Sequence, residues 1–193
     1  QAGTPLLLGT VGEIYAERSG VLNLGVEGMM AMGALTAFMT SFYTGNIGLA
    51  LALAMAAGAL LSLVHGFLSI TMRANQIVSG LAITIFGLGL SGFLGKPMIG
   101  MTAPHLASSP IPILAEIPIV GPILFSQDVL VYASILLALV LWFVLFKTRL
   151  GLNARSVGEN PAMADSLGLN VYLIRYVCVL LGGVMAGLAG AYL

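Results

Sequence analysis

Long apolar stretches follow one another along the chain, and short polar connections separate them. Six of them approach or reach the roughly 20 residues that a helix needs to cross a bilayer. They are residues 4–16, 26–43, 47–72, 76–95, 129–146 and 171–193. Backbone groups in hydrocarbon must be paired within the protein, and no alternating pattern of barrel strands is present. The pattern therefore predicts an all-α integral membrane protein, a polytopic bundle with about six transmembrane helices.

The composition points to the same solvent. Of the 193 residues, 59% are hydrophobic and 7% are charged, against about 25% charged in an ordinary soluble domain. So few charges cannot cover a soluble globule, which excludes a soluble enzyme and a disordered segment. The net charge is zero, so nothing attracts nucleic acid. The expected surroundings are a lipid bilayer.

The basic residues indicate how the chain is oriented. Six of the seven lie in alternate connections: Arg18, Arg73, Lys147, Arg149, Arg155 and Arg175. Because basic residues are enriched on the cytoplasmic side, these connections are expected there, including a coupling loop at residues 147–170. The turn at 43–48 and a proline-rich loop at 97–128 then face outside. That outer loop either docks an external partner or packs on the membrane surface.

Charged residues interrupt the first two apolar stretches: Glu13, Glu17, Arg18 and Glu27. Residues 19–25 lie between Arg18 and Glu27, and they contain two glycines that favour an interruption of the helix. One interpretation is a discontinuous helix pair in which Asn23 and Glu27 line a polar cavity. The other is a cytoplasmic hairpin with an exposed Glu17–Arg18 ion pair of little energetic weight. The position of Glu27, well inside the next span, predicts a buried partner or water for it.

Small residues recur along two of the predicted spans. One series, every fourth residue, predicts a face for close helix packing: Ala54, Gly58, Ser62 and Gly66. A second series is partly polar: Gln76, Gly80, Thr84, Gly87, Ser91 and Gly95. It is interpreted either as the lining of a translocation path or as a helix contact with local hydroxyl bonds. His65 is expected to be a hydrogen-bonded interior residue. No motif for catalysis, metal binding or a cofactor is recognised.

A short helix is predicted within the cytoplasmic loop. Asn160 suits the N-cap, Pro161 the first helical position, and Gly168 the left-handed position after the end. Met163 and Leu167 lie four residues apart, so they share one exposed side. This helix either fits a groove on a partner protein or is a plain surface helix.

Four runs of residues together resemble a known family. The run at 12–30, GEIYAERSGVLNLGVEGMM, resembles the permeases of bacterial ATP-binding cassette (ABC) importers for simple sugars and nucleosides, which are related to the ribose and branched-chain amino-acid permeases. Residues 75–81, 125–128 and 155–171 match in the same order. The resemblance covers nearly the whole chain and implies that residues 1–193 are part of one larger permease domain. It also favours the discontinuous helix pair over the hairpin.

The resemblance implies a function and a set of partners. The chain is expected to be the transmembrane permease subunit of an importer that moves a nucleoside or simple sugar across the bacterial cytoplasmic membrane. It would not be an enzyme itself, because ATP hydrolysis would occur on a separate ATPase subunit. A second permease, either a copy or a relative, and an extracytoplasmic solute-binding protein complete the expected assembly.

Two groups of residues carry the expected roles. The ATPase would contact Glu159, Asn160, Pro161, Met163, Asp165, Leu167 and Gly168. The solute would pass Asn23, Glu27, Gln76, Ser79 and Thr84. Many relatives carry Asn where this chain has Thr84. The alternatives are an ion-coupled secondary transporter that uses Glu13 and Glu27, and a membrane scaffold that transports nothing.

Overall fold

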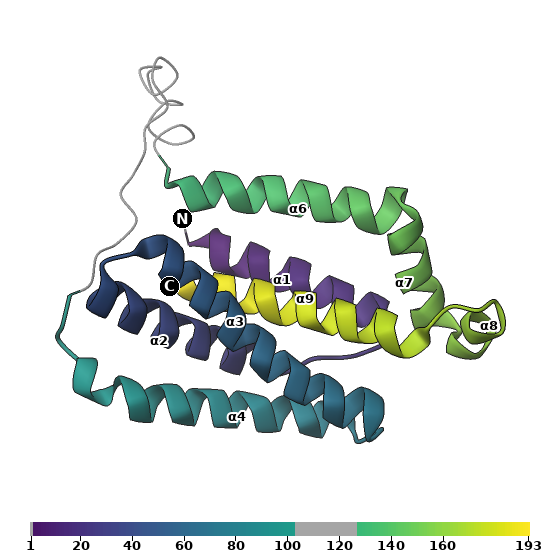
Figure 1. Ribbon diagram of the computed structural model, residues 1–193, viewed down its shortest axis with the longest axis horizontal. Coiled ribbons are helices and arrows are strands. Elements are labelled where there is room, and N and C mark those ends of the chain that lie inside the picture. Colours follow the sequence, from purple (N-terminus) through teal and green to yellow (C-terminus); the bar gives the residue numbers. More distant parts are fainter. Residues whose placement is uncertain (1, 103–126) are drawn as a thin grey trace, which may run out of the picture.

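A computed structural model describes residues 2–102 and 127–193 as a bundle of helices that run roughly parallel and antiparallel (Figure 1). The long helices are α1 (Gly3–Arg18), α2 (Val26–Thr44), α3 (Ile47–Gly66), α4 (Gln76–Gly95), α6 (Val129–Lys147) and α9 (Val171–Tyr192). The shorter elements are the π-helix η1 (Phe67–Thr71), the 3-10 helix η2 (Lys96–Met98), α7 (Arg149–Glu159) and α8 (Pro161–Ser166). Most of the predicted outer loop, residues 103–126, lies outside the described residues.

All six apolar stretches are helical, as predicted. Within the described ranges, four helices are long and apolar enough to cross a membrane: Ile47–Thr71, Gln76–Met98, Val129–Lys147 and Val171–Tyr192. The other two, α1 with 16 residues and α2 with 19, run alongside them. The chain is therefore a polytopic membrane helix bundle, with four spans established by length and composition.

Helix α9 occupies the centre and packs on α1, α2 and α3. Its glycines permit very close approach of the backbones. A Cβ atom at Gly58 of α3 would collide with the carbonyl oxygen of Gly183, and one at Gly187 would collide with that of Ala54. The predicted small-residue face of α3 is thus confirmed as a packing surface, since close contact is how small residues hold membrane helices together.

Helices α4 and α6 lie on opposite flanks of this centre (Figure 1). Helix α4 packs on α2, and α6 packs on α1 and α7. The hydroxyl of Tyr15 in α1 donates a hydrogen bond of 2.6 Å to the carbonyl of Leu141 in α6. Large apolar side chains remain exposed along both flanking helices, such as Ile85 and Leu136. Such surfaces are expected where hydrocarbon, rather than water, is the solvent.

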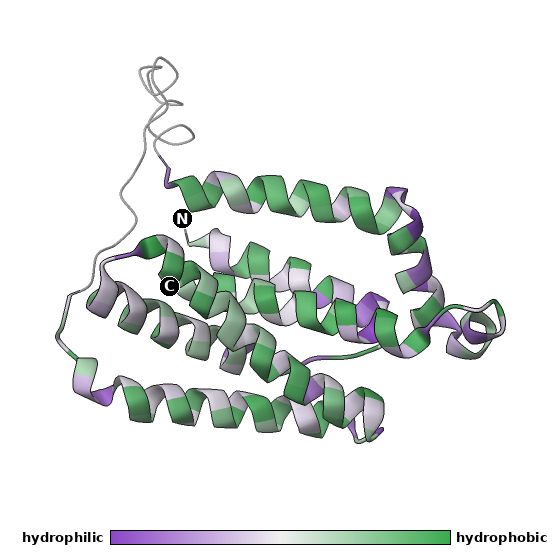
Figure 2. Cartoon of the chain, viewed as in Figure 1, coloured by the Kyte–Doolittle hydropathy of each residue, from purple (hydrophilic) through white to green (hydrophobic). Residues whose placement is uncertain are grey.

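The two ends of the bundle differ in polarity (Figure 2). One end carries α7, α8, the end of α1 and the connection from η1 to α4, and the six basic residues of the alternate connections gather there. Lys96 lies at the other end, near both chain termini. The guanidinium carbons of Arg18 and Arg155 lie 6.0 and 5.4 Å from the centre of the Phe146 ring. The structure therefore places the basic connections together, as their alternation predicted.

Candidate functional site: a helix break tied to a capped cytoplasmic-type helix

Residues 19–25, called the break below, separate α1 from α2 without helical structure. Gly20 adopts a left-handed conformation with φ +85°, which turns the chain away from α1 and which a side chain would oppose. Ser19, Val21 and Asn23 are almost completely buried. The break is therefore inside the protein, which supports the discontinuous helix pair and excludes an exposed hairpin. Buried backbone of this kind requires hydrogen-bond partners from elsewhere.

Side chains from α3 and α4 supply the first of these partners. The Leu22 N–H donates to Oε1 of Gln76 at 2.8 Å, and Nε2 of Gln76 lies 3.4 Å from the carbonyl oxygen of Gly20. Nε2 of His65 lies 3.1 Å from the Leu22 carbonyl, and Nδ1 lies 3.1 Å from the Ser79 hydroxyl. A carbonyl only accepts, so Nε2 carries a proton, and in the neutral ring Nδ1 then accepts from the Ser79 hydroxyl. The prediction that His65 is a hydrogen-bonded interior residue is confirmed.

Glu13 and Asn23 hold the middle of the break. Oε1 of Glu13 accepts the Asn23 N–H at 2.9 Å, and Oδ1 of Asn23 accepts the Gly25 N–H at 3.0 Å. The side-chain nitrogen Nδ2 of Asn23 lies 3.7 Å from the sulfur of Met29. Oε2 of Glu13 is buried and has no hydrogen-bond partner among the described residues. Asn23 is thus a structural residue of the break, with no face open to solvent in this conformation.

The far end of the break rests against the middle of α4. The Thr84 hydroxyl, nine residues into α4, donates a hydrogen bond of 2.7 Å to the Leu24 carbonyl. Side chains at Gly80 or Gly87 would collide with the backbone of Leu24 or Gly28. Of the two interpretations of this partly polar face, helix contact therefore describes Gly80, Thr84 and Gly87. Helix α2 consequently begins about halfway along α4.

Glu27 lies at the surface beside the break. The sequence predicted either a buried partner or water for it, and Glu27 is exposed in the first turn of α2 rather than buried. A carboxylate there is stabilised by the free N–H groups and positive dipole of the helix N-terminus. Of the five predicted pathway residues, Asn23 and Ser79 are buried, Gln76 and Thr84 are half-buried, and Glu27 is exposed. The structure brings four of them to the break and leaves Glu27 beside it.

The start of the break is held from the other side, by α7 and α9. Nε of Arg175, the fifth residue of α9, donates a hydrogen bond of 3.1 Å to the Ser19 carbonyl. Gly158 in α7 packs so closely that a Cβ atom there would collide with the carbonyl of Arg18. Sequence reasoning missed both contacts. The available signal was Arg175 itself, a charged residue four positions inside an apolar helix.

Helix α8 has the capping that the sequence predicted. The Asn160 side chain accepts the Met163 N–H at 3.0 Å, Pro161 occupies the first position, and Gly168 has φ +82°. Met163 is 63% exposed and Leu167 is 76% exposed, so the two apolar side chains stand free at the tip of the bundle. The prediction of a short, capped helix with an exposed apolar side is confirmed.

The rest of the coupling loop is more ordered than predicted. Helix α7 was not expected, and Thr148 caps it by accepting the Gly151 N–H at 3.4 Å. Its residues Gly151, Ala154 and Val157 are buried, which ties the loop to the bundle. Glu159 at the end of α7 and Asp165 within α8, two predicted ATPase contacts, are both exposed.

A polar cleft of about 490 Å³ lies between α8, η1 and the start of α9. Asp165, Arg175 and Gln76 line it together with Arg73. The Arg73 guanidinium donates a hydrogen bond of 3.1 Å to the Tyr172 hydroxyl, which raises the pKa of Arg73. Across the described ranges, no three His, Cys, Asp or Glu side chains gather as metal ligands.

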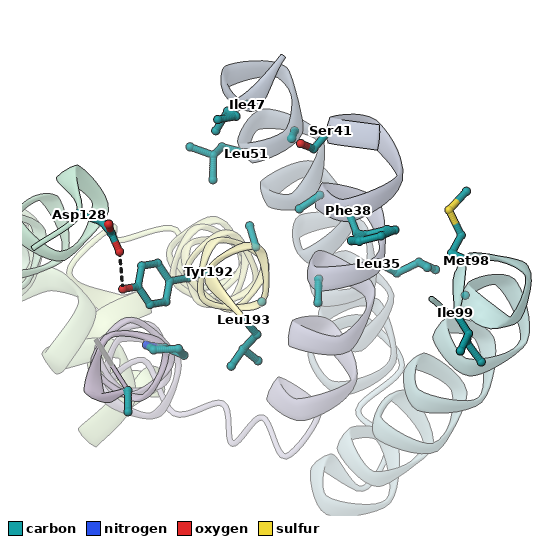
Figure 3. A pocket seen from close by; sticks show the side chains of 18 residues that line it. Leu35, Phe38, Ser41, Ile47, Leu51, Met98, Ile99, Asp128, Tyr192 and Leu193 are labelled. Atoms are coloured by element: carbon teal, nitrogen blue, oxygen red, sulfur yellow. Dashed lines mark hydrogen bonds between the residues drawn. The ribbon is translucent and has the colours of Figure 1, made fainter. Parts of the chain in front are cut away.

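A larger groove of about 960 Å³ opens at the opposite end of the bundle (Figure 3). Most of its lining is apolar and includes Phe38, Leu51 and Leu193. The Tyr192 hydroxyl donates a hydrogen bond of 3.2 Å to Asp128 on one side of it. The protein thus combines a groove at one end, an exposed capped helix at the other end, and a buried break that runs from the end with α8 to the middle of the bundle.

The family of this chain is decided by a match over almost its whole length. The family model described as "branched-chain amino acid transport system / permease component" matches residues 2–193. The chain belongs to this permease family. No solved structure shows significant similarity to it.

Several named permeases are similar to this chain. The guanosine ABC transporter permease NupQ of Bacillus subtilis is 44% identical over 96% of the chain and 62% of its own length. The putative glucose ABC transporter permease TsgC13 of Haloferax volcanii is 42% identical over 100% of the chain and 60% of its own length. The nucleoside ABC transporter permease NupC of Lactococcus lactis is 38% identical over 97% of the chain and 63% of its own length. The chain thus spans about three fifths of these relatives.

Membership of the permease family settles the class of protein. These proteins are transport components rather than enzymes, and this chain is a multi-pass membrane protein. The relatives are named as ABC permeases, so the alternative of an ion-coupled secondary transporter is set aside. The half-buried carboxylate of Glu13 accordingly has a structural explanation, as an acceptor for the Asn23 N–H.

Proposed function

We propose that the chain forms most of the permease subunit of an ABC importer that moves a nucleoside or simple sugar across the bacterial cytoplasmic membrane. The observation that carries this proposal is α8, a rigidly capped helix that presents Met163 and Leu167 at the basic end of the bundle. Exposed apolar side chains on a short helix suit insertion into a groove of another protein. The named relatives, which are nucleoside, guanosine and glucose permeases, support the solute class.

The proposed partners follow from the two ends of the bundle. An ATPase subunit receives α8 on the cytoplasmic side, with Glu159 and Asp165 beside the apolar contact. Asn160, Pro161 and Gly168 set the ends of α8 and so fix the direction in which it projects. An extracytoplasmic solute-binding protein delivers the solute to the end that carries the 960 Å³ groove. A second permease, a copy or a relative, completes the path.

The proposed solute path runs beside the break. Glu27 is exposed there, so its carboxylate contacts a polar solute directly. Thr84 is half-buried and its hydroxyl donates to the Leu24 carbonyl, but the same oxygen can still accept a hydrogen bond from the solute. Asn23, Gln76 and Ser79 act by holding the break in shape, because their hydrogen bonds within the chain occupy them. A carboxylate and a hydroxyl at mid-height suit the hydroxyl groups of a ribose or a hexose.

Replacement of the exposed apolar pair tests the proposal. In the full-length protein expressed with its partner subunits, the double variant Met163→Ala, Leu167→Ala loses two side chains that a groove would bury. Each is worth about 1.5–3 kcal/mol when fully buried, so recovery of the ATPase with the permease should fall by at least about tenfold. Uptake of radiolabelled guanosine or glucose should fall with it.

The matched control is Leu150→Ala in α7, where the side chain is 73% exposed at the same end. It should leave both ATPase recovery and uptake within about twofold, as surface substitutions usually do. Normal coupled uptake by the double variant would remove α8 from this role. A wild-type assembly that hydrolyses ATP without any response to solute would instead support the membrane scaffold.

A further inference from the structure

Two residues contact the start of the break, Gly158 and Arg175, and in the sequence they lie on either side of α8. Gly158 lies two residues before Asn160, the N-cap of α8. Arg175 lies five residues after Asn170, the N-cap of α9. Helix α8 packs on α7 and α9, so its base is formed by the same two elements that hold the break.

The contact between this base and the break is direct and tight. Nε of Arg175 donates to the Ser19 carbonyl at 3.1 Å. A Cβ atom placed at Gly20 would lie 3.1 Å from Nη2 of Arg175 and 3.3 Å from Cα of Gly158. Ser19 is completely buried, so water does not compete for its carbonyl. A hydrogen bond from a charged donor in such surroundings is stronger than one between neutral groups.

The break passes this constraint on to the membrane-spanning helices. Gln76 contacts the residues on both sides of Val21, through the Leu22 N–H and the Gly20 carbonyl. His65 also restrains the break, because its ring is hydrogen-bonded to both the Leu22 carbonyl and the Ser79 hydroxyl. Displacement of the Ser19 carbonyl would therefore act on α3 and α4, because the short segment that follows it is hydrogen-bonded to His65 of α3 and Gln76 of α4.

We infer that Arg175 is a positioning residue that links α8 to the break, so that movement of α8 displaces the Ser19 carbonyl and, through it, the middle of the bundle. The inference rests on the proposed function, because it assumes that an ATPase moves α8. It adds the residue through which this movement reaches the membrane. Arg73, which lines the same cleft, bonds Tyr172 and therefore serves as the contrast.

The test compares Arg175→Met with Arg73→Met in the full-length, assembled transporter reconstituted in lipid vesicles. Methionine keeps much of the apolar stem and removes the donor and the charge. The readout is the number of ATP molecules hydrolysed per solute imported, which a purely structural residue would not change. Loss of a charge-assisted hydrogen bond should raise this ratio by at least about fivefold for Arg175→Met. Arg73→Met should change it by less than about twofold.

The failure of each idea has its own result. If the ATPase does not assemble with the unaltered permease through α8, the proposed function fails. If it assembles and Arg175→Met keeps the wild-type ratio, only the role of Arg175 fails.

A second variant covers the case in which Arg175→Met does not accumulate in the membrane. Arg175→Lys keeps the charge but moves the donor, and a lysine does not reproduce guanidinium geometry. We expect it to raise the number of ATP molecules hydrolysed per solute imported by about twofold or more, and a wild-type ratio would overturn the inference.

A distance measurement gives an independent readout. In either variant, spin labels at Ser166→Cys and Leu24→Cys in a Cys178→Ser background should show a distance that changes between the ATP-free and ATP-trapped states. In the protein with Arg175 intact, the same distance should stay constant.

Discussion

A single side chain, that of Gln76, contacts the break on both sides of Val21. The Gln76 amide accepts from Leu22 N–H at 2.8 Å and lies 3.4 Å from the Gly20 carbonyl. Gln76→Ala would leave the Leu22 N–H without a partner, at a cost of about 1–3 kcal/mol. We expect the full-length protein in detergent to lose its monodisperse peak at a temperature lower by roughly 2–10 °C.

Ser91→Ala is the matched control for this substitution. Ser91 is also in α4, but its hydroxyl bonds only the Leu88 carbonyl of its own helix. In the Ser91→Ala variant, the temperature at which the monodisperse peak is lost should change by less than about 2 °C, since local surface hydrogen bonds contribute little to stability. Equal midpoints for the two variants would show that Gln76 contributes no more than Ser91.

How far individual residues could be predicted depended on how far away their partners lie. Asn160, Pro161 and Gly168 could be assigned because a helix cap involves only neighbours in sequence. The bond from Arg175 to Ser19 joins residues 156 apart, and that from Leu22 to Gln76 joins residues 54 apart. Periodicity does not give the register between helices at such separations. For Glu27, the sequence left open a buried partner or water for a related reason: α2 begins just before Glu27, and only the packing of α2 on α4 leaves this helix N-terminus exposed.

Helices α3 and α9 approach so closely that only the smallest side chains fit between them. A leucine at Gly58 would have to displace the backbone of Gly183 and Gly187. Such overpacking cannot be relieved by a change of rotamer. We expect Gly58→Leu to abolish the monodisperse peak of the detergent-solubilised protein.

Gly89→Leu in α4 is the corresponding control. Beyond the neighbouring backbone of its own helix, no atom of the described residues lies within 4 Å of the position that its Cβ would occupy. An added leucine there faces lipid and should leave both yield and peak shape unchanged. Recovery of well-folded Gly58→Leu protein would mean that α3 and α9 are not packed as described.

The long helices were predictable almost to the residue, and the connection between α6 and α8 was not. Apolar runs bounded by glycine, asparagine or charge mark α4 at the predicted 76–95 and α9 within one residue. Helix α7 lacks such a run, and its buried residues Gly151, Ala154 and Val157 gain their environment only from other helices. Thr148, an N-cap residue three positions before Gly151, was the local signal that could have indicated it.

The gathering of basic residues at one end predicts which side of the bilayer each end faces. In a Cys178→Ser background, Ser166→Cys in α8 should react with a membrane-impermeant maleimide only in inside-out vesicles. Thr44→Cys, exposed at the other end, should react only from outside intact cells. Both expectations follow from the enrichment of Lys and Arg on the cytoplasmic side. The reverse pattern would invert the orientation and place α8 beyond the reach of an ATPase.

The bond between Ser19 and Arg175 also sets an order for biogenesis. A ribosome that adds 5–20 residues per second completes Arg175 about 8–30 s after Ser19, because 156 residues separate them. During that interval α1 and α2 enter the bilayer while the carbonyl of Ser19 still lacks its donor and α9, the helix on which both pack, does not yet exist. The pair α1–α2 therefore inserts early but completes its packing late, and a nascent chain that stalls before α9 leaves polar backbone for quality-control proteases to detect.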